Sequence, residues 1–225
     1  LAGVRSAQRR LADALAAYDQ LVNQNPEDLR FRLGQASLAY QTDRITEAEA
    51  ETVLDQVDQG MSNRDITLSP EFSSLVGVLP ANAQRRSTYE QILAAQPDNI
   101  TIHRRLIQVL AVQDPAQAQA NVDQLIAQNP NNVNVYFVQG ELAQSLGNLA
   151  QAGEAYQTIL NKQPENTDAL TALGGVRFEQ KRYTDAVSLY QQVLALKPGD
   201  LETQRILAEL SIVQDQPLAA LAQLE

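Results

Sequence analysis

Helix-breaking residues return along this chain at a nearly constant spacing, and this regularity restricts the fold more than any other feature. A small residue is followed four positions later by a larger one, and eight positions after that by Pro or Gly. This skeleton recurs six times, with Arg85 in the small-residue position of the third copy. The six breakers are Pro26, Gly60, Pro97, Pro130, Pro164 and Pro198, separated by 34, 37, 33, 34 and 34 residues. Such a period predicts a repeat array rather than one globular core.

Each repeat contains two expected helices and no strand pattern. The pair in 167–197 is clearest: Leu173 and Gly174 in its first helix, and Ala186 and Tyr190 in its second, lie at helical spacing. Small residues at these positions allow neighbouring backbones to approach, and the large residues beside them fill the remaining space. The fold class is therefore all-α, built from stacked antiparallel helix pairs.

Several helix starts are chemically marked. Ser69 and Asp114 each precede a proline, which is the order of an N-cap residue and a first helical residue. Between them, Pro80 occupies the position of the inter-helix turn of its unit. The spacing from Gly60 to Pro97 is three residues longer than the 34-residue period, and the irregular stretch 60–85 within it is either a degenerate repeat with a lengthened loop or a binding feature.

The array resembles the tetratricopeptide repeat, a 34-residue helix-turn-helix unit. The residues that carry the resemblance are Leu173, Gly174, Tyr183, Ala186, Tyr190 and Pro198, and before them Tyr136, Gly140, Gly147, Ala152, Tyr156 and Pro164. It covers essentially the whole chain and is most specific in 133–200. The resemblance implies a right-handed α-solenoid, or superhelix, whose first helices line a concave groove that binds partners.

The domain organisation that follows is a single array over 1–225, truncated at both ends. Neither end has the polar cap that a solenoid terminus needs, so we expect the natural protein to continue in both directions. The expected units are 1–26 (partial), 27–65, 66–99 (degenerate), 100–132, 133–166, 167–200 and 201–225 (partial).

Composition excludes several classes of function. The net charge is −10 and the pI about 4.6, which disfavours nucleic acid and anionic membrane surfaces as partners. No apolar run approaches the ~20 residues that span a bilayer, so direct membrane insertion is not expected. There is no cysteine, which removes disulfides and thiolate chemistry. We expect no catalytic residue, metal or cofactor, and the single histidine, His103, is interpreted as an ordinary helix residue.

The resemblance assigns partner-binding residues to the concave face. Phe137 and Phe178 are expected as hydrophobic anchors. Arg32, Arg104 and Arg205 are expected to hold carboxylates or backbone carbonyls of a peptide. The full predicted set is Phe31, Arg32, Gln35, Arg104, Gln108, Asn134, Phe137, Glu141, Gln144, Thr171, Phe178, Glu179, Arg205 and Glu209. A carboxylate clamp of the lysine-asparagine-arginine kind is not expected, because all three lysines lie in or near second helices.

The leading functional hypothesis is a non-catalytic protein-protein interaction scaffold that binds a peptide or helix of a partner. The alternative is a periplasmic segment of a larger bacterial polysaccharide-synthesis, export or secretion machine, or an assembly factor for a membrane complex. The compartment stays open between cytoplasmic and periplasmic or lumenal, with a membrane tether outside this chain as one option. Self-association through exposed repeat ends also stays open.

Overall fold

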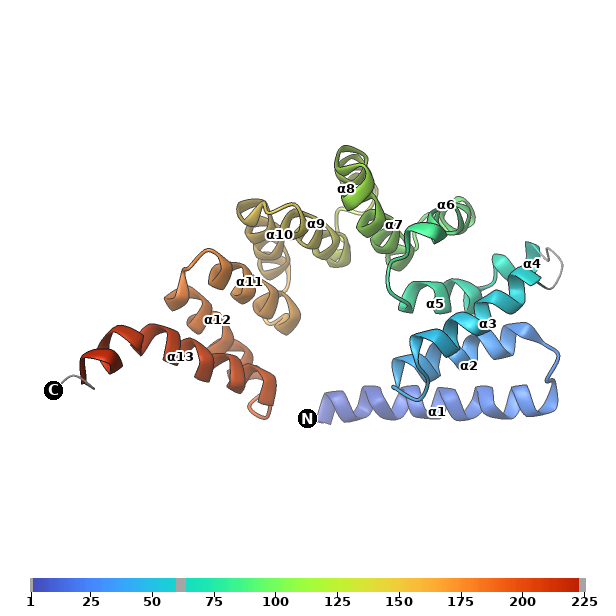
Figure 1. Cartoon of the computed structure of the whole chain (residues 1–225), viewed down its shortest axis with the longest axis horizontal. Coiled ribbons are helices and arrows are strands. Elements are labelled where there is room, and N and C mark those ends of the chain that lie inside the picture. Colours follow the sequence, from blue (N-terminus) through green and yellow to red (C-terminus); the bar gives the residue numbers. More distant parts are fainter. Residues whose placement is uncertain (1, 60–63, 223–225) are drawn as a thin grey trace. The chain divides into compact units, whose positions relative to one another are not determined.

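The computed structural model describes residues 2–59 and 64–222, and every regular element in these ranges is a helix (Figure 1). The expected all-α class, built from paired helices, is confirmed. The chain divides into two compact units, Ala2–Leu110 and Ala111–Glu225. No helix in the described ranges combines the length and apolar character that crossing a bilayer requires.

The first unit holds long and short helices. They are α1 (Ala2–Gln24), α2 (Leu29–Gln41), α3 (Glu47–Gln59), α4 (Arg64–Thr67), α5 (Pro70–Val78), the 3-10 helix η1 (Ala83–Arg85), α6 (Arg86–Ala95) and the start of α7 (Ile100–Gln113). The second unit is more regular, and its helices are α8 (Pro115–Gln128), α9 (Val133–Ser145), α10 (Leu149–Lys162), α11 (Thr167–Glu179), α12 (Tyr183–Leu196) and α13 (Leu201–Ala222).

The same Pro-x-Asx turn separates five helix pairs. The residue before each proline ends a helix with an N–H bond to the carbonyl four positions back, as Gln163 does to Ile159 at 2.7 Å. The Asx side chain then caps the next helix, as Asn166 does by accepting from the N–H of Ala169 at 3.0 Å. The five capping residues are Asp28, Asn99, Asn132, Asn166 and Asp200. The N-caps expected at Ser69 and Asp114 are also present.

Packing in the second unit follows chain order. Helix α10 packs between α9 and α11, and α12 packs between α11 and α13. Their shared core includes the buried residues Tyr156, Ile159, Leu170 and Leu173. Figure 1 shows α9–α12 as two successive hairpins. The amphipathic pattern of the sequence is thereby accounted for, because its apolar positions are the buried ones.

Glycines and tyrosines meet where the helices cross. A β-carbon on Gly174 would lie 2.9 Å from Cζ of Tyr190, and one on Gly140 would lie 2.5 Å from the ring of Tyr156. Tyr156 and Tyr190 are buried, and burial raises the pKa of the Tyr190 hydroxyl. The interpretation of these tyrosines as core residues is confirmed.

The first unit departs from this regular arrangement at α2. This helix packs most extensively against α1 and α5, and less so against α3. A hydrogen bond of 2.8 Å joins the hydroxyls of Ser37 on α2 and Ser74 on α5. Pro80 lies between α5 and η1, as the sequence predicts, and Arg85 forms an ion pair with Glu51 of α3. Gly60, the breaker expected here, lies outside the described residues.

Candidate partner-binding face

Two predicted residues from neighbouring first helices contact each other directly in the second unit. Gln144 on α9 donates from Nε2 to Oε1 of Glu179 on α11, at 3.2 Å. The same amide accepts from the hydroxyl of the buried Tyr156 on α10, at 2.7 Å. This chain of bonds orients the Gln144 amide from both ends, so that α9 and α11 present polar groups on one side of the unit.

Aromatic side chains lie beside this polar chain. Phe137 is half-buried, and its ring centroid is 6.0 Å from that of Tyr156. Phe178 is 42% exposed and packs against Tyr183 at the start of α12, with ring centroids 5.6 Å apart. Phe178 is therefore an accessible aromatic surface held in place by a neighbouring ring, which suits an anchor residue.

The remaining predicted residues of this unit lie on α9, α11 and α13. Asn134 is exposed at the start of α9, and Glu141 and Thr171 are half-buried. Arg205 and Glu209 are exposed on α13 and form an ion pair with each other. Arg205 also contacts Glu202, and these carboxylates raise the pKa of its guanidinium. Arg205 is thus engaged within its own helix, so binding a partner's carboxylate would involve competition with two of its own acids.

Residues predicted on α2 border a pocket in the first unit. Arg32 and Gln35 line a cavity of 320 Å³ among α1, α2 and α3, while Phe31 is half-buried next to them in sequence. Gln35 donates from Nε2 to Oδ1 of Asp19 on α1, at 2.8 Å. The cavity is also lined by apolar residues, namely Leu15, Ala36, Ala39, Ile45 and Val53.

On α7 the sequence predicts a binding role for Arg104, whereas the structure shows that its neighbour Arg105 bonds another helix. Arg105 donates from Nε to the Gly77 carbonyl at 2.9 Å and from Nη2 to the Val78 carbonyl at 3.3 Å. It thereby satisfies two carbonyls at the C-terminus of α5, which is a stabilising role. Gln108 accepts from Nη1 of Arg105 at 3.1 Å, and Arg104 is half-buried. No sequence signal distinguishes the two arginines, because the difference lies in which face of α7 meets α5.

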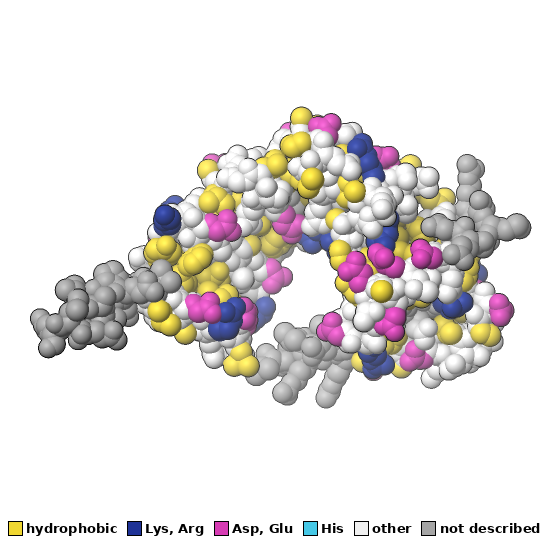
Figure 2. All heavy atoms as spheres, viewed as in Figure 1, with side chains coloured by type: hydrophobic (Ala, Val, Ile, Leu, Met, Phe, Trp, Pro, Cys, Tyr) yellow, Lys and Arg dark blue, Asp and Glu magenta, His cyan; other side chains and the backbone are white. Residues whose placement is uncertain are grey.

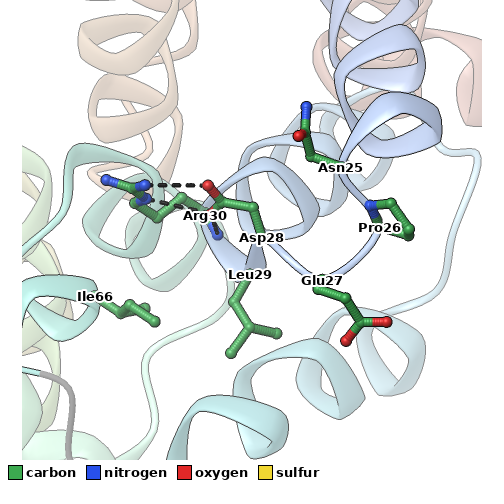
Figure 3. A pocket seen from close by; sticks show the side chains of 7 residues that line it. All are labelled: Asn25, Pro26, Glu27, Asp28, Leu29, Arg30 and Ile66. Atoms are coloured by element: carbon green, nitrogen blue, oxygen red, sulfur yellow. Dashed lines mark hydrogen bonds and ion pairs between the residues drawn. The ribbon is translucent and has the colours of Figure 1, made fainter.

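A larger pocket lies at the turn between α1 and α2 (Figure 3). It measures 670 Å³ and is lined by residues 25–30 together with Ile66 of α4. Its principal charged groups are paired with each other: Asp28 contacts Arg30 at 3.0 Å and also caps α2. The Arg30 contact lowers the pKa of the Asp28 carboxyl. These groups hold the turn together, which gives them a structural role.

His103 also has a structural partner. Its Nε2 lies 2.8 Å from the carbonyl oxygen of Pro97, six residues earlier. Tyr136 and Gln204 bond the carbonyls of Pro130 and Pro198 from the same relative position, at 2.8 and 3.0 Å. In the described part of the chain, His103, Tyr136 and Gln204 thus each contact the carbonyl of the proline six residues earlier, and so help to secure a Pro-x-Asx turn. Within the described ranges, no cluster of three or more His, Asp or Glu residues is arranged to hold a metal ion.

Charged side chains of both signs are interspersed over the face shown in Figure 2. On that face the described residues form no continuous basic surface of the kind that a nucleic-acid backbone requires.

A sequence model described as "Tetratricopeptide repeat" matches residues 2–61, 109–166 and 137–200. A curated relative, the peroxisomal targeting signal receptor of Saccharomyces cerevisiae, is 26% identical over 95 residues, which are 42% of this chain. The chain spans only 16% of that relative's length.

Solved structures show the same fold at low identity. Yeast Tom70 superposes with a TM-score of 0.56 at 13% identity, over 84% of this chain and 40% of Tom70. TTC0263 of Thermus thermophilus, described as a thermophilic TPR protein, gives 0.51 at 16% identity, over 93% and 95% of the two chains. YrrB, described as a TPR protein with an unusual peptide-binding site, gives 0.50 at 17% identity, over 86% and 98%.

Proposed function

The chain belongs to the tetratricopeptide repeat family, and on that premise we propose that it is a non-catalytic scaffold for one partner protein. Proteins of this family typically mediate protein-protein interactions. The proposed contact surface is the face of α9, α11 and α13 that carries Phe137, Gln144, Phe178 and Glu179. A peptide or helix of the partner would lie across these helices.

The bond between Gln144 and Glu179 is the observation that carries this proposal. It joins side chains 35 residues apart that the sequence pattern places on one expected binding face. Groups that are oriented before binding lose less conformational entropy when the partner arrives. An amide and a carboxylate held in this way can bond the backbone or polar side chains of a peptide, and the aromatic rings can supply apolar contact.

The expected partner is a peptide, because the repeated first helices form an extended face and not a closed cavity. Successive first helices offer similar positions at intervals of one unit, which matches an extended or helical segment better than a compact small molecule. The description of YrrB as a protein with a peptide-binding site supports the same class of partner.

Selection of peptides from a random display library on the purified chain tests the proposal. Binding of the selected peptides is then measured by calorimetry for the wild type, Phe178→Ala and Glu179→Arg. Because both side chains are exposed, we expect the two variants to fold and to bind about tenfold more weakly. The matched control is Gln157→Ala, an exposed position of α10 whose side chain bonds only Asn161 on its own helix.

Equal affinity of all three variants would refute this binding face. Binding that is lost in Gln157→Ala but kept in Glu179→Arg would place the partner on the second helices instead. Thermal unfolding of each variant establishes that a loss of binding does not come from a loss of structure.

A further inference from the structure

The pocket among α1, α2 and α3 is lined by both apolar and charged side chains. Four charged side chains line it: Asp19, Arg32, Arg44 and Glu49. Its volume of 320 Å³ is at the small end of the range of about 300–1,000 Å³ for ligand sites, and suits one or two side chains rather than a cofactor. The whole pocket lies within the first compact unit.

The two carboxylates of the pocket are occupied by donors of the chain itself. Asp19 accepts from Gln35 at 2.8 Å. Glu49 accepts from the backbone N–H of Thr46 at 2.8 Å and from its hydroxyl at 2.9 Å, which forms a capping box at the start of α3. Each acid therefore already has a hydrogen-bond donor before any ligand arrives.

Unlike the two carboxylates, the guanidinium groups of the two arginines of the pocket have no hydrogen-bond partner of this kind among the described residues. Within the described part of the chain, the guanidinium groups of Arg32 and Arg44 make no hydrogen bond or ion pair. This is unusual in a chain of net charge −10, where acids outnumber bases. Other arginines in the described part of the chain do contact a carboxylate, among them Arg30, Arg85, Arg86, Arg182 and Arg205.

We propose that this pocket binds an acidic side chain, together with an adjacent aliphatic side chain, of a partner peptide. The guanidinium fork of Arg32 or Arg44 pairs well with a carboxylate. The aliphatic neighbour would then contact the apolar lining residues Leu15, Ile45 and Val53. The proposal rests on the proposed function in one respect, the peptide class of the partner, and it adds a second site on different helices.

Three short N-acetylated peptides test the assignment. Each is titrated into the isotope-labelled full chain, and the backbone amide chemical shifts are followed by NMR. The first contains Leu-Glu-Leu between Gly-Ser flanks and has an amidated C-terminus. The second replaces Glu by Gln, and the third carries Leu-Gln-Leu with a free C-terminal carboxylate. We expect shifts at residues that line the pocket, with the Glu peptide binding at least about fivefold more tightly than the Gln peptide.

The variants identify the groups responsible. The double variant Arg32→Ala/Arg44→Ala should bind the Glu peptide about tenfold more weakly. Arg10→Ala, which changes an exposed arginine of α1 outside the pocket, should leave its affinity unchanged. Equal binding of the Glu and Gln peptides, unchanged affinity of the double variant, or equal binding of free sodium acetate at the same concentration would each overturn the proposal. Tighter binding of the Leu-Gln-Leu peptide with a free C-terminus than of the Glu peptide would show that the pocket prefers a terminal carboxylate to a side-chain one. That result would also overturn the proposal.

The Glu179→Arg variant separates this proposal from the proposed function. It alters α11 in the second unit and should leave binding of the Glu peptide to the pocket unchanged. If that variant keeps full affinity for library-selected peptides while the pocket variants lose the Glu peptide, the α9–α11 face fails and the pocket stands.

Discussion

The ring of Tyr156 fills the space that a β-carbon on Gly140 would need, with its Cε1 2.5 Å from that position. The same relationship joins Gly174 and Tyr190 in the next unit, at 2.9 Å from Cζ. Each tyrosine lies on the second helix of a pair and rests against the backbone of the first. The distance between the two helices of a unit is therefore set by an aromatic ring against a residue with no side chain.

The adjacent glycines of α11 give a direct test of this packing. We expect Gly174→Ala to lower the free energy of unfolding by about 1–3 kcal/mol, because the methyl group would displace the buried Tyr190. In Gly175→Ala the new carbon would meet only the Tyr190 hydroxyl, at 3.8 Å. There the better helix propensity of alanine should leave stability unchanged or raise it by up to about 1 kcal/mol. Urea unfolding followed by circular dichroism measures both, and equal effects of the two substitutions would contradict the account.

The hydroxyl of Tyr156 should contribute measurably to stability. In Tyr156→Phe the partly buried bond to Gln144 is lost, and we expect a cost of about 1 kcal/mol. Tyr136→Phe is the matched comparison, because its hydroxyl bonds the Pro130 carbonyl in an exposed position and should cost less. Chemical unfolding of both variants gives the difference. A larger loss for Tyr136→Phe would show that the turn bond, rather than the partly buried one, matters more.

Arg105 should stabilise the first unit more than any surface arginine does. Arg105→Met keeps much of the aliphatic stem but removes the donors to Gly77 and Val78, and should cost about 1–3 kcal/mol. Arg86→Ala removes an exposed ion pair with Glu90 and should cost less than about 1 kcal/mol. Thermal unfolding of each variant, together with amide hydrogen exchange in α5, distinguishes the effects of the two substitutions. Protection of α5 that is unchanged in Arg105→Met would refute the capping role.

The contribution of Glu49 to the stability of α3 should be lost at acidic pH. Two hydrogen bonds from Thr46, chiefly the one from its backbone N–H and also the one from its hydroxyl, lower the pKa of the Glu49 carboxyl below the ordinary value of 4.5. A lowered folded pKa means that the stabilisation is present above the unfolded pKa and disappears as the pH falls through the folded value. The carboxyl carbon of Glu49 should accordingly titrate below 4.5 in an NMR experiment.

Glu49→Gln provides the control for that titration. It should be less stable than the wild type at about pH 7, and the difference should be smaller at about pH 3, because the stabilisation by the charged carboxyl is lost as the pH falls through its lowered folded-state pKa. A difference in stability that is the same at both pH values would show that the charge of Glu49 is not involved.

The repeat and its helix boundaries could be predicted because their signals are local. Proline, the Asx cap and the small-residue positions act within a few residues of the chain, so Asn166 and Gly174 can be interpreted without knowing the partner helix. Two members of the predicted binding set, Gln144 and Glu179, lie in contact in the regular part of the array. The role of the set in binding stays a prediction.

The contacts between particular helices could not be predicted, because the repeat pattern of the sequence does not specify which faces of the helices meet. The packing of α2 against α5 arises in the irregular stretch, where the period fails as a guide. Arg105 and Arg104 look alike in sequence, and only the contact of α7 with α5 separates them. The pocket beside Arg32 is equally invisible, since Arg44 reaches it from the turn after α2 and Val53 from α3.

The Pro-x-Asx turns have a consequence for how such a chain can evolve. Every hydrogen bond described at these junctions connects residues that are close neighbours in sequence, from the bond of Gln163 to Ile159 to that of Tyr136 with Pro130. A junction of this kind is complete in itself and does not depend on which unit follows. Duplication or deletion of a whole 34-residue segment would leave every other junction intact, so the gene can change the length of the array without redesigning it.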